Sequence, residues 1–157
     1  MAINNAAPII PSGGAATIII GEMVELVLER ATEAFTSEPI VVSGVTAPGS
    51  MRYRSSYVDF WTQDGIVYQV MVHDNYAGKF LGKIGLGSTL ADVEKAFGPI
   101  KAILDSLVVK GLPGIAFEPK DDDDINSPIY EIYVWKPDWA EIYEHQSDDT
   151  YHWFSHQ

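Results

Sequence analysis

The chain has 157 residues, 46% of them apolar and 20% charged, which is enough for one domain with a sizeable core. It contains no cysteine, and this excludes disulfides, thiol catalysis and thiolate metal sites. The formal net charge is −12, which disfavours nucleic acid as a ligand because phosphate contacts need lysine and arginine.

The acidic residues are unevenly distributed along the chain. Residues 1–100 carry ten acidic and six basic side chains, whereas residues 101–157 carry twelve and four. Opposite net charges accelerate encounter, so this surface favours a basic protein partner, although an acidic surface also serves solubility alone. Residues 1–20 lack a Lys/Arg cluster, and prolines and glycines interrupt their apolar run. We therefore expect no secretory signal, no membrane association and a cytoplasmic location.

The first predicted elements are a short strand and a helix. Residues 17–20 are apolar and β-prone, and Gly21 follows them. From residue 22 to residue 35 apolar side chains recur at spacings of three and four, as in an amphipathic helix. Pro39 forbids continuation of this helix.

A hairpin is predicted next. Residues 39–44 indicate a short strand, residues 46–50 a turn, and residues 51–61 a strand rich in Tyr, Ser and Val. Residues 62–65 contain Asp-Gly in the place that two-residue hairpin turns favour, and residues 66–73 form the return strand.

The second half begins with another helix. Ser88 or Thr89 can cap it, and Gly98-Pro99 ends it. Strands are predicted at residues 107–109, 114–118 and 129–135, and a charged turn lies between the last two. The remaining residues, 136–157, mix acidic and aromatic side chains without a clear period.

The two halves repeat one order of elements. Residues 67–72 (VYQVMV) and 129–134 (IYEIYV) nearly match at an offset of 62, and Phe60 corresponds to Phe117. Further upstream the offset is 66, and the matched positions are Ile18, Ile20, Gly21, Val24 and Val27 with Ile84, Leu86, Gly87, Leu90 and Val93.

This repetition predicts an α+β fold made of two tandem helix-plus-antiparallel-sheet repeats, at about residues 15–75 and 81–136. One short helix covers one face of an antiparallel sheet, so two such units placed edge to edge form one continuous sheet with helices on one face. Residues 1–157 are then a single domain, to which residues 137–157 add an acidic and aromatic extension.

Residues 85–100, GLGSTLADVEKAFGPI, followed by a strand ending in IYEIYVW, resemble the G-x-(S/T)-x-x-(D/E)-V-x-x-x-x-G-x-P repeat of β-lactamase-inhibitor-protein-like domains. The motif falls on Gly87, Ser88, Asp92, Val93 and Gly98-Pro99. The first half departs from it, since Met23 stands at a Ser/Thr position and no Gly-Pro follows. Outer-membrane assembly lipoproteins and small immunity proteins of bacterial toxin systems share this fold. The resemblance implies a concave sheet that grips a protein partner.

Alternation along the predicted strands separates an apolar face from a mixed one. The apolar face takes Val58, Phe60, Tyr68, Val70, Val72, Tyr130, Ile132 and Val134. The other face takes Tyr57, Asp59, Trp61, Gln69, Met71, Glu131, Tyr133 and Trp135. Aromatic residues and Met without Lys are typical of protein interfaces, so this set is the predicted partner-binding surface. Alternatively, the C-terminal segment covers it as a second core.

The acidic run Asp121, Asp122, Asp123 and Asp124 does not match a calcium-binding EF-hand. An EF-hand needs Gly at its sixth position and Glu at its twelfth, where this chain has Asn126 and Ile132. A solvated hairpin loop explains the run, with attraction of a cationic partner as an additional role. His152 and His156 have the spacing of a helical metal pair but lie near the C-terminus. We expect no metal and no cofactor.

The chain contains no phosphate-binding loop and no nucleophile elbow, so we do not expect an enzyme. The leading hypothesis is an immunity protein that occludes a cationic, nuclease-like toxin with its acidic, aromatic sheet face. A second hypothesis is an enzyme or small-molecule-binding protein with a pocket between the sheet and the C-terminal segment, using Asp59, His73 and Glu131. A third is a structural accessory module. The partner's identity and the oligomeric state stay open.

Overall fold

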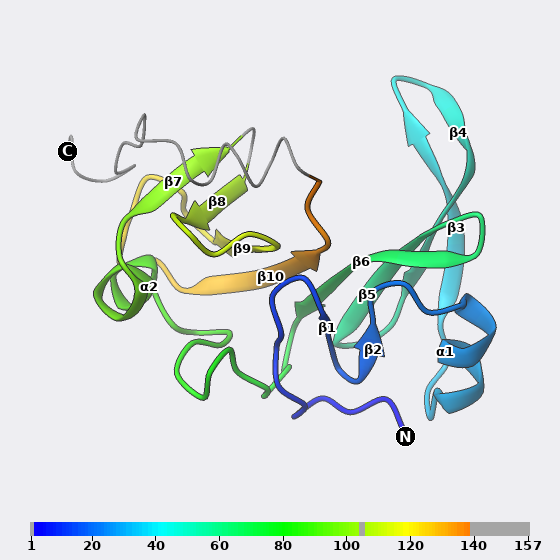
Figure 1. Cartoon of the computed structure of the whole chain (residues 1–157), viewed down its shortest axis with the longest axis horizontal. Coiled ribbons are helices and arrows are strands. Elements are labelled where there is room, and N and C mark those ends of the chain that lie inside the picture. Colours follow the sequence, from blue (N-terminus) through cyan, green and yellow to red (C-terminus); the bar gives the residue numbers. More distant parts are fainter. Residues whose placement is uncertain (1, 104–105, 139–157) are drawn as a thin grey trace.

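The computed structural model describes residues 2–103 and 106–138, and it has an α+β fold in which strands dominate (Figure 1). A six-stranded antiparallel sheet has the order β3-β4-β5-β6-β10-β9, and β1-β2 and β7-β8 form two small sheets. The predicted α+β class is therefore confirmed. The bounds are β1 Gly14–Ala15, β2 Ile18–Ile19, α1 Val24–Arg30, β3 Thr36–Val42, β4 Val45–Arg54, β5 Val58–Gln63, β6 Ile66–His73, α2 Leu90–Phe97, β7 Ile100–Ile103, β8 Ser106–Val109, β9 Ile115–Pro119 and β10 Ile129–Trp135.

The main core lies on one face of the six-stranded sheet. Two cross-strand rows, each at most 1% exposed, form its floor: Val58, Val72, Ile132 and Phe117, and Phe60, Val70, Val134 and Ile115. Val24 and Val27 of α1 and Leu90 and Val93 of α2 pack into the same core. Neither described helix is long and apolar enough to cross a lipid bilayer.

The first helix is shorter than its sequence pattern predicts. It ends at Arg30, because Ala31 has extended backbone angles, and residues 36–42 form β3 instead. Pro39 lies within β3, which the sheet tolerates because β3 is its edge strand and the pairing with β4 shifts register directly after Pro39. The β-branched residues Thr36, Ile40 and Val41 suit a strand better than a helix.

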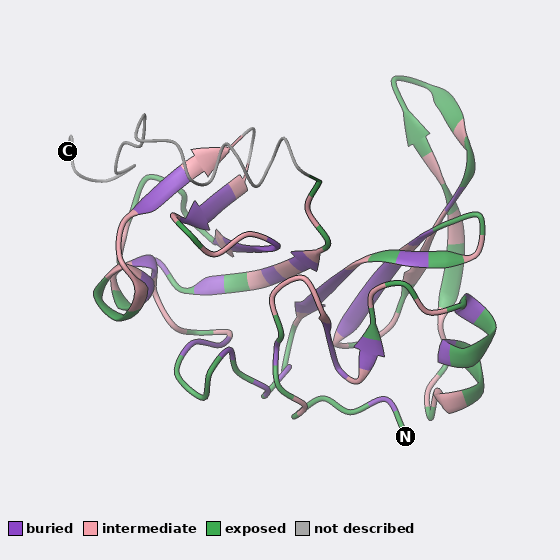
Figure 2. Ribbon diagram, in the orientation of Figure 1, coloured by how far each residue is buried: buried purple, intermediate pink, exposed green. Residues whose placement is uncertain are grey.

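The predicted turn at residues 46–50 is wrong, because these residues lie inside β4. The chain turns earlier, at Ser43 and Gly44, whose φ angles are 52° and 79°. The resulting β3–β4 hairpin projects from the molecule, and its tip is exposed (Figures 1 and 2). The second predicted turn is confirmed: Asp64 and Gly65 have φ angles of 51° and 81° and join β5 to β6.

The second half follows its predicted elements closely. Helix α2 begins after Thr89, whose side chain accepts a hydrogen bond from Asp92 N, while the Asp92 side chain accepts one from Thr89 N. Strands β8, β9 and β10 are at the predicted places. Strand β7 was missed, because the Gly98-Pro99 signal conceals the short apolar run that follows it.

The two helix starts give a matched test of capping. Thr89→Ala should cost about 1 kcal/mol of unfolding free energy, because the backbone N–H of Asp92 loses its acceptor, the Thr89 hydroxyl. Met23 occupies the same position before α1, and its side chain forms no cap hydrogen bond and is 53% exposed. Met23→Thr should therefore stabilise the protein by several tenths of a kcal/mol. Urea unfolding of both variants checks the pair, and a loss of stability in Met23→Thr would contradict it.

The hairpins β5–β6 and β9–β10 share one pairing register. At the offsets of 57 between β5 and β9 and 62 between β6 and β10, each of the five residue pairs of β9–β10 corresponds to a pair of β5–β6. Both hairpins shift register at the same place, which leaves Tyr68 and Tyr130 as the extra residues. Because of this bulge, the alternation of buried and exposed side chains is inverted at the start of β6 and β10. Val67 and Ile129 are buried, while Tyr68 and Tyr130 are about 40% exposed. Their predicted place on the apolar face was therefore wrong.

Candidate functional site

The face of the sheet opposite the main core carries a mixed set of side chains, which we call the sheet face. Cross-strand pairing aligns them in three rows. The first row is Trp135, Gln69, Trp61 and Arg52; the second is Ala116, Tyr133, Met71 and Asp59; the third is Glu118, Glu131 and His73. Seven of the eight predicted sheet residues, all except Tyr57, therefore lie together.

The aromatic side chains form the middle of the sheet face. The rings of Trp61 and Tyr133 lie 6.2 Å apart, and the Arg52 guanidinium lies 4.7 Å from the Trp61 ring centroid. Trp61, Tyr133 and Trp135 are half-buried, while Met71 is 2% exposed. Trp61 thus contacts both Tyr133 and Arg52, and Tyr133 also donates a hydrogen bond to Glu131, so these two rings are ordered before a partner binds.

Asp59 is not a free acidic group. It is 2% exposed, and its Oδ2 accepts hydrogen bonds from Arg52 Nη2 at 2.7 Å and Nε at 3.2 Å. Its Oδ1 lies 2.8 Å from His73 Nε2. Burial raises the pKa of Asp59, but the hydrogen bonds from His73 and Arg52 outweigh it and hold the pKa below its ordinary value. Asp59 therefore orients Arg52, which in turn lies over Trp61.

His73 lies between two carboxylates. Its Nε2 faces Asp59 and its Nδ1 lies 2.7 Å from Asp74 Oδ2, so only the imidazolium donates to both. The hydrogen bond to Asp59 raises the pKa of His73, burial opposes it, and the bond to Asp74 adds to the increase. The pair Asp59–His73 is thus a buried ion pair of the fold, and Arg52 completes it.

This cluster predicts how stability depends on pH. The folded pKa of His73 lies above its ordinary 6.5, so its contribution is complete below that value and is lost as pH rises through the folded pKa. The folded pKa of Asp59 lies below 3.8, so its contribution is lost only as pH falls through that lower value. Urea unfolding should therefore give a larger His73→Gln effect at pH 5.5 than at pH 8.5. An effect independent of pH would contradict this.

Glu118 and Glu131 form the acidic part of the sheet face. They are directly opposite each other on β9 and β10, an unfavourable arrangement for two like charges. Burial raises the pKa of Glu118, and the negative charges of Glu131 and Asp122 raise it further. Tyr133 donates its hydroxyl to Glu131 Oε1 at 3.1 Å. Within the described residues, neither carboxylate has an ion-pair partner, so both are available to a cation.

Two predicted sites lie away from the sheet face. Tyr57 precedes β5 and packs on the main core, with its ring 6.1 Å from that of Tyr76. Asp121–Asp124 lie in the exposed β9–β10 loop, where Asp121 Oδ1 accepts a hydrogen bond from Asp123 N and Asp124 Oδ1 accepts one from Asn126 N. The local backbone thus uses two of these carboxylates to form turns.

Residues 139–157 lie outside the described part of the chain. They include His152 and His156, and also the C-terminal segment that would cover the sheet or line a pocket with it.

The predicted partner-binding set omits three charged residues of the sheet face, namely Arg52, His73 and Glu118. Alternation along the strand could have found His73, because it lies two residues after Met71 and therefore on the same face. Glu118 is likewise on the face opposite Phe117 of the core. The place of Arg52 depends instead on the pairing of β4 with β5.

Neither a family model nor a curated protein sequence matches the chain. Among solved structures, a cysteine-rich secretory protein (SAV1118) from Staphylococcus aureus subsp. aureus Mu50 is similar, with a TM-score of 0.48 and 12% sequence identity. The match covers 85% of this chain and 49% of that chain, so this chain spans about half the length of that protein. A similarity at this level carries no information about function.

Proposed function

We propose that this protein is a non-enzymatic inhibitor that binds a basic protein partner through its sheet face. The observation that supports it most directly is the row of Trp135, Gln69 and Trp61 beside Tyr133, all half-buried, with Trp61 and Tyr133 in ring contact next to the two glutamates of the sheet face. Ordered aromatic side chains supply much of the affinity of protein interfaces, and acidic neighbours select a cationic surface.

The proposal includes an internal duplication of residues 15–75 and 81–136. The shared hairpin register supports it, as do equivalent backbone hydrogen bonds: Gly21 N to Val67 O and Gly87 N to Ile129 O, and Val67 N to Glu22 O and Ile129 N to Ser88 O. The β6–β10 pairing is symmetric about Met71 and Tyr133, so a pseudo-twofold axis through that pair relates the repeats and keeps both helices on one face. The separate β7–β8 sheet marks where the second repeat diverges.

The resemblance to β-lactamase-inhibitor-protein-like domains makes the proposal more specific. Its motif residues Gly87, Asp92 and Gly98 lie at the start and end of α2, where a positive φ, a capping carboxylate and a helix stop are needed. Together with the net charge of −12, this favours a cytoplasmic immunity protein that neutralises a cationic, nuclease-like toxin by occluding it.

Binding to the basic polypeptide encoded by a neighbouring reading frame tests the proposal. Trp61→Ala and Tyr133→Ala should each weaken binding by about 2 kcal/mol, or roughly thirtyfold, as central aromatic residues do. The affinity should also fall as the salt concentration rises from about 50 to about 300 mM. Ile19→Ala, at a 61% exposed position outside the sheet face, is the control. Unchanged binding by both aromatic variants would refute the sheet face as the interface.

A further inference from the structure

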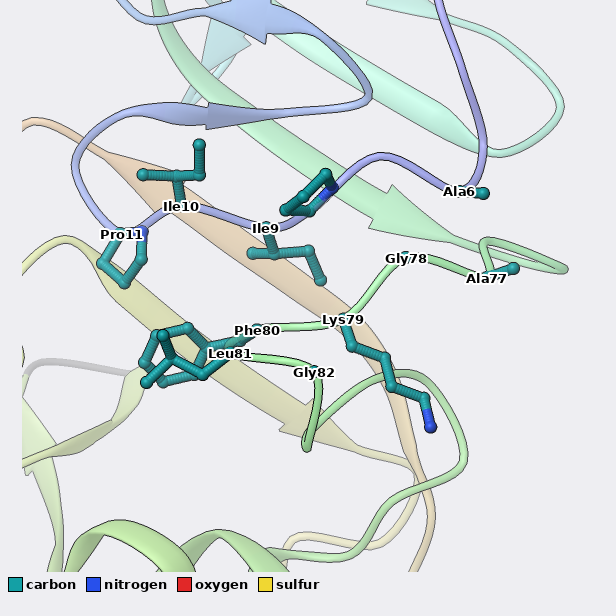
Figure 3. A pocket seen from close by; sticks show the side chains of 11 residues that line it. Ala6, Ile9, Ile10, Pro11, Ala77, Gly78, Lys79, Phe80, Leu81 and Gly82 are labelled. Carbon is teal, nitrogen blue, oxygen red and sulfur yellow. The ribbon is translucent and has the colours of Figure 1, made fainter.

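Exposed aliphatic side chains gather at three places: beside residues 6–11 and 77–82 (Figure 3), at the tip of the β3–β4 hairpin, and at the start of helix α1. The third group, which we call the α1 patch, consists of Met23, Leu26 and Ile66, which are 53%, 47% and 41% exposed. Met23 and Ile66 are partners in an antiparallel bridge, so their side chains are neighbours, and Leu26 follows about one helical turn after Met23.

The start of helix α2 has the same backbone arrangement as the start of α1. Met23 and Thr89 each precede their helix with extended backbone angles, and each bridges the beginning of the second strand of its hairpin. Three residues later come Leu26 and Asp92. In α2 the side chains of Thr89 and Asp92 cap the helix, whereas Met23 forms no cap hydrogen bond.

The fold therefore does not require aliphatic side chains at positions 23 and 26. The same backbone accepts a polar capping pair, which stabilises a helix start, and α1 forgoes that pair in favour of two exposed aliphatic side chains. Exposed aliphatic groups gain burial only when another molecule covers them, and a group of them typically marks an interaction surface.

Charge beside the α1 patch indicates what kind of molecule covers it. Glu25 and Glu29 lie one turn apart on the exposed side of α1, next to Leu26 around the helix. Within the described residues neither glutamate has an ion-pair partner. Arg30, the basic residue of α1, is paired with Glu22 at 2.6 Å. The unpaired charge next to the patch is therefore negative.

This negative charge selects among the molecules that an aliphatic surface can bind. A second copy of the chain would bring the same carboxylates together, and each copy carries a net charge of −12. An anionic lipid surface would be repelled in the same way. A helix with aliphatic side chains on one face and Lys or Arg beside them is complementary to both the patch and its carboxylates.

We propose that the α1 patch binds an amphipathic helix of a basic protein. The aliphatic face of that helix lies on Met23, Leu26 and Ile66, and its Lys or Arg side chains pair with Glu25 and Glu29. Helix α1 packs on the main core, on the side of the sheet opposite the sheet face. The two surfaces are separate, so either proposal stands without the other.

A titration with a synthetic leucine–lysine peptide, whose leucines recur at spacings of three and four, tests this by ¹H–¹⁵N NMR. Saturable shifts should occur at the amides of residues 22–30 and 65–67. A lysine–alanine peptide of the same charge should bind there about tenfold more weakly, because it lacks the aliphatic face. The double variant Glu25→Gln/Glu29→Gln should weaken binding of the leucine–lysine peptide by about three- to tenfold.

The variant Met23→Thr/Leu26→Asp separates the aliphatic contact from charge. It gives α1 the capping pair of α2 and adds a carboxylate, so a purely electrostatic contact would become tighter. We expect binding about tenfold weaker instead. The capping gained offsets the burial lost, so unfolding should occur at a similar urea concentration. Met23→Thr alone should weaken binding about threefold, which makes the test independent of Leu26→Asp.

Val41→Thr is the control, because Val41 is 57% exposed on the β3–β4 hairpin, away from α1, and the change should leave binding unchanged. The proposal is overturned if Met23→Thr/Leu26→Asp binds the leucine–lysine peptide as tightly as the unmodified protein does. It is also overturned if the lysine–alanine peptide binds equally well, or if saturable shifts occur only outside residues 22–30 and 65–67.

Discussion

Phe60→Ala should lower the free energy of unfolding by about 3–5 kcal/mol, the usual cost of removing a buried aromatic ring. Phe60 is fully buried, its ring stacks on Tyr53 at 4.7 Å, and it meets the edge of Phe35 at 5.2 Å. The cavity would open under the junction of β4, β5 and the segment that follows α1. Urea unfolding monitored by circular dichroism measures the change.

Phe117 provides the matched comparison. It occupies the corresponding place in the β9–β10 hairpin and is 1% exposed, but it has no ring partner in the described part of the chain. Phe117→Ala should therefore cost about 1 kcal/mol less than Phe60→Ala, since an aromatic pair contributes about 0.5–1.5 kcal/mol beyond its burial. Val41→Ala, at a 57% exposed position, should change stability by less than about 0.5 kcal/mol. A larger effect at Phe117 than at Phe60 would contradict the comparison.

Asp59→Ala should cost about 3 kcal/mol at pH 5.5, because it leaves Arg52 and the charged His73 without their shared acceptor. Asp59→Asn retains one acceptor oxygen and the shape of the side chain, so it should cost less, about 1–2 kcal/mol. Unfolding measured in urea at pH 5.5 distinguishes the two variants.

The pH profile separates this role from simple packing. Without Asp59 the main cause of the raised His73 pKa is absent, so the unfolding free energy of Asp59→Ala should change less between pH 5.5 and 8.5 than that of the unmodified protein. Glu38→Ala is the control, since it removes a partner from the exposed Arg54 pair and should cost less than about 1 kcal/mol. Identical profiles for Asp59→Ala and the unmodified protein would show that the cluster does not govern the pH dependence.

Local signals predicted the second half of the chain better than the first. Thr89, Asp92 and Gly98 are residues whose own chemistry starts or ends a helix, so α2 was predicted correctly. Residues 31–36 continue the apolar spacing of α1, but they cross to the sheet because Phe35 packs on Phe60 of a distant strand. Periodicity does not include that contact, and the helix was predicted too long.

The sequence predicted most of the side chains that make up the sheet face, but it did not predict which of its charged groups are paired. Strand parity brought Trp61, Tyr133 and Trp135 to one face, where the structure has them. Parity assumes an unbroken strand, and the bulges at Tyr68 and Tyr130 break it. The engagement of Asp59 was not predictable either, because Arg52 reaches it from a neighbouring strand whose register no local pattern specifies.

The amino-acid order alone specified the α+β class, the Asp64-Gly65 turn, α2 and the strand that ends at Trp135, since each depends on side chains within a few residues. Tertiary pairing decided where α1 ends, that Arg52 and His73 engage Asp59, and that Ile9 and Phe80 pair side by side. These features arise between segments distant in the chain, where burial and shared hydrogen bonds outweigh local preference.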